Sequence, residues 1–468
     1  MKEWGIEDDR FQSVSKFEEM LGKNKQLYFD IEEFEDIIDF YIDNNNLSHA
    51  NKAIDIAMLQ HPISDSIQLR QAVVHIQNIN ASQAISILEK LIKVNPNQYE
   101  TIIAYSSALL LQGKDKLAEV YLKKAFEINL EESAGFLYHN GLNYLTSGRY
   151  DYAIKFLLIS YNYDKNNYYA LNDIAFCYER LNDYKKSINY YNKYLDQDPF
   201  DEIIWYNLGI VYERAGKTES ALEAYDFTIT INQKYDLAFY SKANLLISLG
   251  RYYEAIELFH ELAEIAEEKA DIYCLIGECY EKAEEYTNAH KYYKKSLEED
   301  KTYSDSWFGI AMVKSAKEEY FESLYYLRMA ISFDDSNEEY FLELGKINQK
   351  LGFLDDADKN FNKAIEIAPY DDELWSFYAE MYIKQTNYDK ALRILYEAKS
   401  NISDSSNILY KISVCEIFTG NYNAGFKFFE KALKIDYKLH KEYLEKFSEL
   451  KLYKEVSELI QTYKNTHN

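Results

Sequence analysis

The rarest residues of this chain recur at multiples of one distance. The four prolines stand at positions 62, 96, 199 and 369, with gaps of 34, 103 and 170 residues. Multiples of 34 also separate the members of two other sets, which are Trp205, Trp307 and Trp375, and Gly141, Gly209, Gly277 and Gly345. One period of 34, with a single residue inserted between the second and third proline, therefore governs the chain. Such a period predicts a stack of similar units rather than separate globular domains.

Two series of small residues set the register of the repeat. Their members are always Gly, Ala or Ser, and the step is 34 residues except once in each series, where it is 35. The first series runs from Ala72 to Ser413 and the second from Ala50 to Gly425. The inserted residue lies between Ala118 and Gly141, and we expect it in a loop near residues 130–133. A large apolar residue follows each member of the second series by four positions, which is typical of closely packed helices.

One unit, residues 202–235, shows the design. Apolar or small residues lie three, four and seven positions after Trp205 and so share one helical face. Gly216 interrupts this helix, since glycine tolerates the left-handed conformation that ends many helices. A second helix is predicted at about residues 219–231, with Ala221 and Tyr225 on its buried face. Neither helix can bury its apolar face alone, so neighbouring units must stack.

Composition supports an all-helical chain and limits the classes of partner that it can bind. The sequence has 47% hydrophobic residues but only 15 glycines and four prolines in 468 residues, which leaves little material for a many-stranded fold. Its formal net charge is −26, which disfavours nucleic acid and anionic membranes. Residues 1–43 hold 13 acidic and five basic residues. The uncharged stretch at residues 101–113 is too short to span a bilayer.

The motifs of enzymes and metal sites are missing from the sequence. There is no HExxH, nucleophile elbow or glycine-rich dinucleotide motif. Three cysteines, Cys177, Cys279 and Cys415, hold equivalent positions on separate units and are expected to be small buried residues. Cys274 lies five residues before Cys279, which is the wrong spacing for a CxxC metal or redox pair. We therefore expect no catalytic activity, no metal, no cofactor and no small-molecule substrate. The first residues lack the apolar core of a secretory signal, so we expect a cytoplasmic protein.

The residues of the repeat resemble the tetratricopeptide repeat. The resemblance is carried by Trp205, Leu208, Gly209, Tyr212, Ala221, Tyr225 and the prolines at unit ends. It covers residues 31–439 as about twelve units, in an array of the bacterial type that consists of repeats alone. It implies an all-α fold, a right-handed α-α superhelix of stacked helix-turn-helix units with a concave inner surface. Residues 1–30 and 440–468 are expected to form capping helices.

The resemblance also implies where a partner binds. In this family the face of each first helix that points away from the second helix lines the concave groove. Asparagines on this face can donate to and accept from an extended peptide, and aromatic residues supply contact area. The candidate partner-binding residues are Tyr138, His139, Asn172, Tyr206, Asn207, Glu213, Arg214, Tyr240 and Asn244.

These observations favour a non-enzymatic scaffold that binds a protein or peptide segment in the groove. A second possibility is a structural assembly protein whose acidic surface docks a basic partner. A third is an RNA-binding helical-repeat protein, because related arrays read one base per repeat. The third requires a basic groove, which the net charge of the chain opposes.

Overall fold

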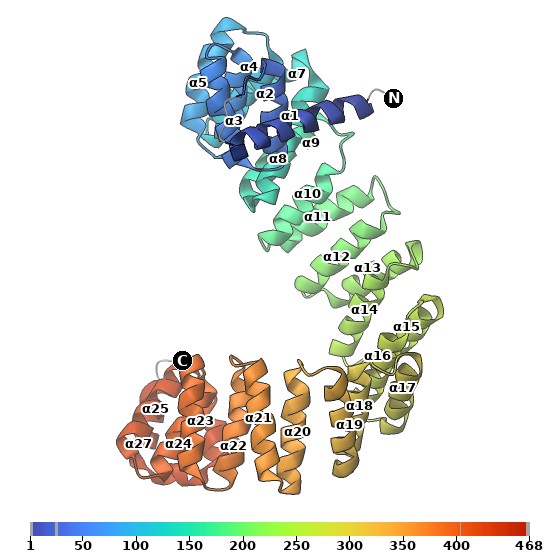
Figure 1. Ribbon diagram of the computed structural model, residues 1–468, viewed down its shortest axis with the longest axis vertical. Coiled ribbons are helices and arrows are strands. Elements are labelled where there is room, and N and C mark those ends of the chain that lie inside the picture. Colours follow the sequence, from blue (N-terminus) through green and yellow to red (C-terminus); the bar gives the residue numbers. More distant parts are fainter. Residues whose placement is uncertain (1–2, 24–26, 403, 465–468) are drawn as a thin grey trace. The chain divides into compact units, whose positions relative to one another are not determined.

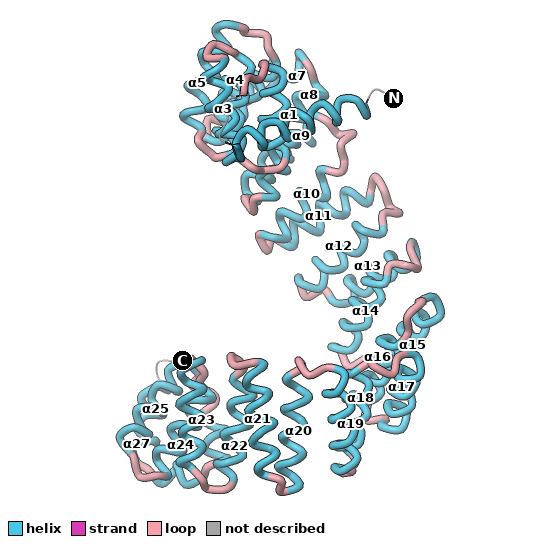
Figure 2. Tube along the Cα trace, in the orientation of Figure 1, coloured by secondary structure: helices cyan, strands magenta, loops and turns pink. Residues whose placement is uncertain are grey.

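Every element of the described chain is a helix. The computed structural model describes residues 3–23, 27–402 and 404–464, with side chains from residue 11 onward. No strand occurs in these residues (Figure 1 and Figure 2). The helices run from α1 to α27 with one 3-10 turn, η1, between α26 and α27. The predicted all-α fold is confirmed. None of the helices in the described ranges combines the length and the apolar character that a membrane span requires.

The chain divides into two compact halves, Met1–Lys242 and Ala243–Asn468. The helices of the N-terminal half are α1 (Glu3–Lys23), α2 (Ile31–Asp43), α3 (Leu47–Gln60), α4 (Asp65–Gln77), α5 (Ala81–Val94), α6 (Tyr99–Leu111), α7 (Asp115–Ile128), α8 (Leu130–Thr146), α9 (Tyr150–Tyr163), α10 (Ala170–Arg180), α11 (Tyr184–Leu195), α12 (Glu202–Arg214) and α13 (Thr218–Ile231). Helix α14 (Asp236–Ser248) includes the residue at which the halves divide.

The helices of the C-terminal half are α15 (Tyr252–Ile265), α16 (Ala270–Lys282), α17 (Tyr286–Glu299), α18 (Ser304–Ala316), α19 (Tyr320–Phe333), α20 (Glu338–Leu351), α21 (Leu354–Ile367), α22 (Asp372–Lys384), α23 (Tyr388–Asn401), α24 (Ser406–Phe418), α25 (Tyr422–Ile435), α26 (His440–Lys446), η1 (Ser448–Leu452) and α27 (Lys454–Lys464). From α2 onward the even-numbered helices up to α24 are the first helices of the repeats, and the odd-numbered helices up to α25 are the second.

The turn inside each repeat takes the same backbone conformation whether or not it contains glycine. Positive φ angles recur at one position of the repeat. Six of these residues are glycines and six are not: Gly113, Gly148, Gly216, Gly250, Gly352 and Gly420; Asn45, Ile79, Asn182, Glu284, Glu318 and Thr386. A β-branched residue such as Ile79, with φ of 61°, adopts this conformation only where the surrounding packing enforces it. Stacking of the two helices therefore determines the turn more strongly than the turn residue does.

The small residues of the first series form close contacts with the next helix. A Cβ atom on Gly209 would lie 2.6 Å from Cε1 of Tyr225, and one on Gly277 would lie 2.7 Å from Cδ1 of Tyr293. Both tyrosines are buried. The glycines thus give the aromatic rings of the second helices room to lie against the backbone of the first. The prediction of a close-packed helix pair is confirmed.

The inserted residue does not form a loop. Residues 130–133 are the first turn of α8, which has 17 residues, whereas α12 has 13. Only Asn129 separates α8 from α7, and its side chain accepts a hydrogen bond from the main-chain nitrogen of Glu132 at 3.2 Å. The prediction of a loop near residues 130–133 was wrong, because this cap and two acidic residues in the first turn favour helix.

Helix α6 departs from the amphipathic pattern of the other first helices in the N-terminal half. Every residue from Thr101 to Leu110 is buried. A helix that is apolar on all sides must be covered on all sides. Helices α5 and α7 cover one part of it, and α4 and α8 cover the opposite part and also contact each other. This arrangement accounts for the uncharged stretch at residues 101–113.

The terminal helices cover the outer repeats of each half. Val14, Phe17 and Met20 of α1 are buried with residues of α2 and α3 in one apolar cluster. At the other end, Tyr443 of α26 donates a hydrogen bond to the main-chain oxygen of Asn407 in α24 at 3.1 Å. Helix α24 is buried from Ile408 to Ile417, as α6 is along its own length. Both of these buried first helices, α6 and α24, therefore pack against helices beyond their own repeat.

Candidate functional site

Several candidate residues bond to one another across neighbouring first helices. The hydroxyl of Tyr138 in α8 donates to Oδ2 of Asp173 in α10 at 2.7 Å. The hydroxyl of Tyr206 in α12 lies 3.2 Å from Oγ of Ser241 in α14. These contacts cross one face, built from the sides of α2, α4, α6, α8, α10, α12 and α14 that point away from the second helices. We call it the first-helix face.

An ion pair adds to the contacts between neighbouring first helices, and we call this series of contacts along α8, α10, α12 and α14 the ladder. Nη1 of Arg214 in α12 donates to Oε1 of Glu179 in α10 at 2.5 Å. Burial raises the pKa of Glu179, and Arg214 opposes that shift. Burial likewise raises the pKa of Asp173, while the hydroxyl of Tyr138 opposes the shift by donating to its carboxylate. Polar groups of neighbouring first helices thus already form hydrogen bonds with one another in the absence of a bound protein.

The remaining candidate residues differ in how available they are. Glu213 accepts a hydrogen bond from the buried Tyr225 at 3.0 Å, so it also positions a core ring. Nδ2 of Asn172 donates to Asp173 at 3.4 Å. Asn207 is half-buried and makes no side-chain hydrogen bond within the described ranges. Tyr240 is half-buried on α14, and Asn244 is exposed and belongs to the C-terminal half.

His139 leads to a hollow that the sequence did not predict. The hollow has a volume of about 690 Å³ and lies among α2, α4, α6 and α8. Its polar lining includes six carboxylates and one guanidinium: Glu35, Asp39, Asp43, Glu100, Glu131 and Glu132; Arg70. Its apolar lining includes Ile42, Leu69, Val73, Tyr99 and Phe136. We call this feature the acidic hollow.

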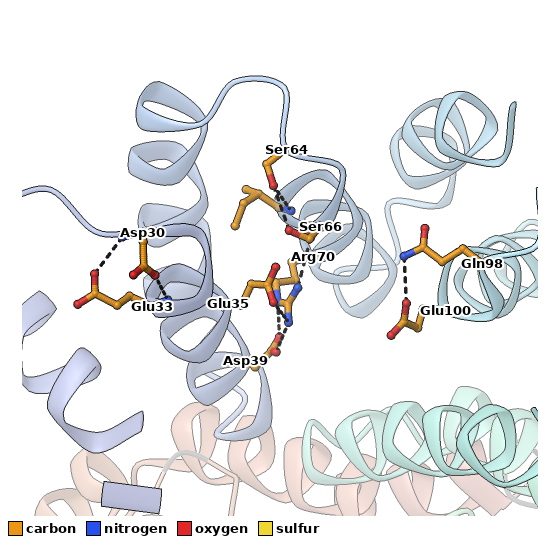
Figure 3. Close-up of polar contacts among 10 residues, drawn as sticks. Asp30, Glu33, Glu35, Asp39, Ser64, Ser66, Arg70, Gln98 and Glu100 are labelled. Carbon is orange, nitrogen blue, oxygen red and sulfur yellow. Dashed lines mark hydrogen bonds and ion pairs between the residues drawn. The ribbon is translucent and has the colours of Figure 1, made fainter. Parts of the chain in front are cut away.

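Arg70 is committed to the wall of the acidic hollow. Its Nε and Nη2 atoms donate to the two carboxylate oxygens of Asp39 at 2.9 and 2.6 Å, and Nη2 lies 3.4 Å from Oε2 of Glu35 (Figure 3). Such a bidentate pair holds the guanidinium in place. Figure 3 also shows Gln98 donating to Glu100, at 3.0 Å. The one arginine of the lining therefore neutralises part of the α2 wall and leaves the α6 and α8 side negative.

The hollow exists because α4 and α8 hold each other beside α6. The side-chain amide of Gln77 donates to Oδ1 of Asn140, and the hydroxyl of Tyr144 donates to the main-chain oxygen of Ile76. Nη1 of Arg149 donates to the main-chain oxygen of Gln77 at 2.7 Å. These bonds join repeats that are not neighbours in sequence. We call them the α4–α8 clasp.

One atom of the clasp lacks a partner. Asn140 is 2% exposed and lines the hollow, yet its Nδ2 atom has no hydrogen-bond acceptor within the described ranges. A buried donor without an acceptor costs about 1–3 kcal/mol. In native structures such groups are few, and a bound water or ion is one of the ways in which their missing partner is supplied.

Electrostatics in the hollow follow from its lining. Burial raises the pKa of Tyr99, and the carboxylates of Glu100 and Glu132 raise it further. Glu131 and Glu132 form no ion pair with any residue that the structure describes. A cation that entered the hollow would gain interactions that the chain itself does not supply.

The C-terminal half has a smaller acidic hollow of about 320 Å³, lined among others by Glu278, Glu281, Asp305, Glu339 and Lys282. Burial raises the pKa of Glu278 to about 7, and the neighbouring Asp305 carboxylate adds to the shift. Tyr293 donates to Glu281 at 2.7 Å, so part of this charge is used inside the fold.

The cysteines are buried and free, as predicted. Burial raises the pKa of Cys177, Cys279 and Cys415 to about 12, so their thiols stay protonated near neutral pH. Among the residues that the structure describes, no group of three His, Cys, Asp or Glu side chains is arranged to hold a metal ion.

The sequence carried two signs of the hollow. Acidic residues crowd positions 1–43, and the stretch at 101–113 is uncharged. Neither sign reveals that α4 and α8 meet, because the periodic pattern reports contacts only between helices of the same or adjacent repeats. The clasp residues Gln77, Asn140 and Arg149 were therefore not predicted from the sequence.

Comparisons with known proteins agree with this architecture. One tetratricopeptide repeat model matches residues 178–230, and a second matches residues 237–269, 270–303, 338–371 and 406–439. A TPR repeat-containing protein of Methanocaldococcus jannaschii is 24% identical over 393 residues, which are 70% of this chain and 68% of that protein.

Two further proteins are similar over different lengths. The peroxisomal targeting signal receptor of Saccharomyces cerevisiae is 23% identical over 217 residues, which are 45% of this chain but only 35% of the receptor. The crystal structure of yeast Tom70 superposes with a TM-score of 0.45 and 14% identity, and the alignment covers 93% of this chain and 95% of that one.

Proposed function

We propose that this chain, which is a tetratricopeptide repeat protein, is a non-enzymatic scaffold. It binds a segment of a partner protein on the first-helix face of its N-terminal half. Proteins of this repeat family generally mediate protein–protein interactions. The segment starts at the acidic hollow and continues along α8, α10 and α12, past Tyr138, Asn172, Tyr206 and Asn207.

The acidic hollow is the observation that carries the proposal. Its volume of about 690 Å³ is in the range that binding sites use for groups of side-chain size and larger. Apolar residues such as Val73 and Phe136 share the lining with charged ones, so a segment could bury an aliphatic stem while its polar end meets carboxylates. His139, at its edge, connects the hollow to the ladder of α8, α10 and α12.

The relatives support the same class of function. The peroxisomal targeting signal receptor is by its name a receptor for a signal, and the matched part spans about a third of it. Only the class of activity, binding of a protein segment, is carried over to this chain.

Site-specific photo-crosslinking tests the proposal. A photoreactive p-benzoylphenylalanine would replace His139 or Asn207 on the first-helix face of the full chain in its native cell. Matched controls would replace Glu127 of α7 or Glu223 of α13, which are exposed on second helices. We expect the same partner to be captured from positions 139 and 207 and not from positions 127 and 223.

The opposite pattern would overturn the proposal. Capture from the second-helix positions alone would place binding on the other side of the repeats. Absence of any specific adduct at positions 139 and 207 would equally reject the first-helix face as the binding surface. If a partner is captured at positions 139 and 207, the variant with Tyr206→Ala and Asn207→Ala should reduce recovery of that partner. Its helicity, measured by circular dichroism, should not change.

A further inference from the structure

We propose that the acidic hollow binds an arginine or lysine side chain of the partner segment, and that Asn140 donates a hydrogen bond to a main-chain carbonyl oxygen beside that residue. This inference rests on the proposed function and adds to it the chemistry of the bound segment. It concerns the wall formed by α6 and α8, together with the clasp that holds α8 against α4.

The charge of the lining selects a cation. Six carboxylates face a single guanidinium, and Arg70 already pairs with Asp39 and Glu35. Glu131, Glu132 and Glu100 form no ion pair with the described residues, and Glu100 accepts hydrogen bonds only from the neutral groups of Gln98 and Tyr99 there. Opposite charges in a partly enclosed site attract more strongly than on an open surface.

The unpaired donor of Asn140 adds a second and independent requirement. The residue is 2% exposed, lines the hollow, and has no acceptor for Nδ2 in the described chain. An amide donor is satisfied by a carbonyl or by an anion, but the surrounding carboxylates repel an anion. A neutral carbonyl next to a positive group meets both requirements, and a peptide with a basic side chain supplies both in one molecule.

The apolar lining fits the stem of such a side chain. Ile42, Leu69 and Val73 line the hollow with the rings of Tyr99 and Phe136. Lysine and arginine bury their methylene groups against apolar surface while their charged ends meet polar groups. A bare metal ion would use neither the apolar lining nor the amide donor.

Binding of three small probes to the full chain tests this inference. The first is a fluorescent, end-blocked decapeptide of Gly and Ser with one central Arg, and the second has citrulline, which is uncharged, in place of Arg. The third is ethylguanidinium, a cation without a peptide carbonyl, used as a competitor. At low salt we expect the Arg peptide to bind at least ten-fold more tightly than the citrulline peptide, and more tightly than ethylguanidinium.

Matched variants locate the site. The double variant Glu131→Gln and Glu132→Gln should weaken binding of the Arg peptide at least five-fold, and Glu100→Gln provides a second test on α6. The control pair Glu257→Gln and Glu261→Gln changes the net charge equally, but lies exposed on α15 of the other half. It should alter affinity less than two-fold. Asn140→Leu should weaken the Arg peptide and leave ethylguanidinium unaffected.

Several results would overturn the inference. Equal affinity for the Arg and citrulline peptides would remove the cation requirement, and equal losses in the site and control variants would reduce the effect to net charge. If Asn140→Leu lowers affinity for both cationic probes alike, the carbonyl contact is wrong. If the probes do not bind as expected but a partner is crosslinked at positions 139 and 207, only this inference is rejected. Probe binding without a crosslinked partner at these positions rejects the proposed binding of a partner on the first-helix face.

Discussion

The guanidinium of Arg149 lies 2.7 Å from the main-chain oxygen of Gln77, to which it donates a hydrogen bond. Arg149 precedes the first residue of α9, and Gln77 is the last residue of α4. The bond thus ties the end of one first helix to the start of a second helix two repeats later. It also satisfies one of the carbonyl groups that the end of a helix leaves without a partner.

Replacement of Arg149 tests how much the clasp contributes. We expect Arg149→Ala to lower the free energy of unfolding of the N-terminal half by about 1.5–3 kcal/mol, since a charged donor to a half-buried carbonyl is lost. Hydrogen exchange should accelerate at the end of α4 and along α6. Arg251→Ala is the matched control, because Arg251 holds the equivalent position three repeats on and forms an exposed pair with Glu254 at 2.6 Å. Such pairs contribute little, so similar losses in both variants would contradict the role of the clasp.

Gly277→Ala tests the close contact with Tyr293. The added methyl group would lie 2.7 Å from the ring, so the buried tyrosine or the helix must move. We expect a loss of about 1–3 kcal/mol in urea denaturation. Gly135→Ala is the control, because nothing lies within 4 Å of its Cβ position and alanine favours helix by about 0.5–1 kcal/mol. Unchanged stability of the Gly277 variant would show that the seam is looser than the contact implies.

We expect Glu278 to make the C-terminal half less stable above pH 7 than below pH 4.5. Its pKa is about 7 in the fold against 4.5 for the free group, because burial and Asp305 disfavour the charged form. A raised carboxyl pKa means that stability rises as the pH falls from 7 towards 4.5. Glu281, Glu339 and Lys282 also face this carboxylate. We expect Glu278→Gln to stabilise the half by about 1–3 kcal/mol at pH 8, after allowance for solvent screening, and little at pH 5. A gain that is the same at both pH values would contradict this assignment.

The pH dependence of stability expected from Glu380 is opposite to that expected from Glu278. Burial opposes its ionisation, but Lys411 and Lys446, at 3.0 and 2.9 Å, outweigh burial and lower its pKa to about 2 from 4.5. A lowered carboxyl pKa gives stability that is complete above pH 4.5 and is lost as the pH falls towards 2. Glu380→Gln should cost about 3–5 kcal/mol at pH 7, because Lys411 is 5% exposed and would lose its buried partner.

A second variant separates the ion pair from general damage. Glu380→Gln combined with Lys411→Met removes both buried charges and should recover most of the loss, measured as the urea midpoint of the C-terminal half. Failure to recover would mean that Glu380 stabilises the fold through contacts other than the pair. The acid-induced loss between pH 4.5 and 2 should also be smaller in the double variant.

The repeat, its register and its helices could be predicted from sequence because they depend on local spacing. The small residues at Gly209 and Gly277 identified the contacts between paired helices. The turn at Ile79 could not be read from its residue, since packing of the helix pair imposes the left-handed conformation there. The turn before α8 was misread for a similar reason, as the cap of Asn129 extends the helix into an expected loop.

The candidate site was predictable only in part. Placing ligand contacts on first helices led to Tyr138, His139 and Tyr206, and the structure assigns these residues to one face. It also reveals that Tyr138 and Arg214 are engaged with Asp173 and Glu179, which no single repeat discloses. The acidic hollow depends on two helices meeting across a third, and such a contact leaves no period in the sequence.

The clasp also bears on how this array could have grown. A solenoid in which each repeat touches only its neighbours can gain or lose a repeat at any junction, because every junction is alike. Here α4 and α8 contact each other across an apolar α6. Deleting any 34-residue segment between them would remove α6 itself and leave the sides of α4 and α8 that pack on it without a partner. Duplications and deletions that preserve a folded chain should therefore fall outside α4–α9, and the second, third and fourth repeats should be inherited together.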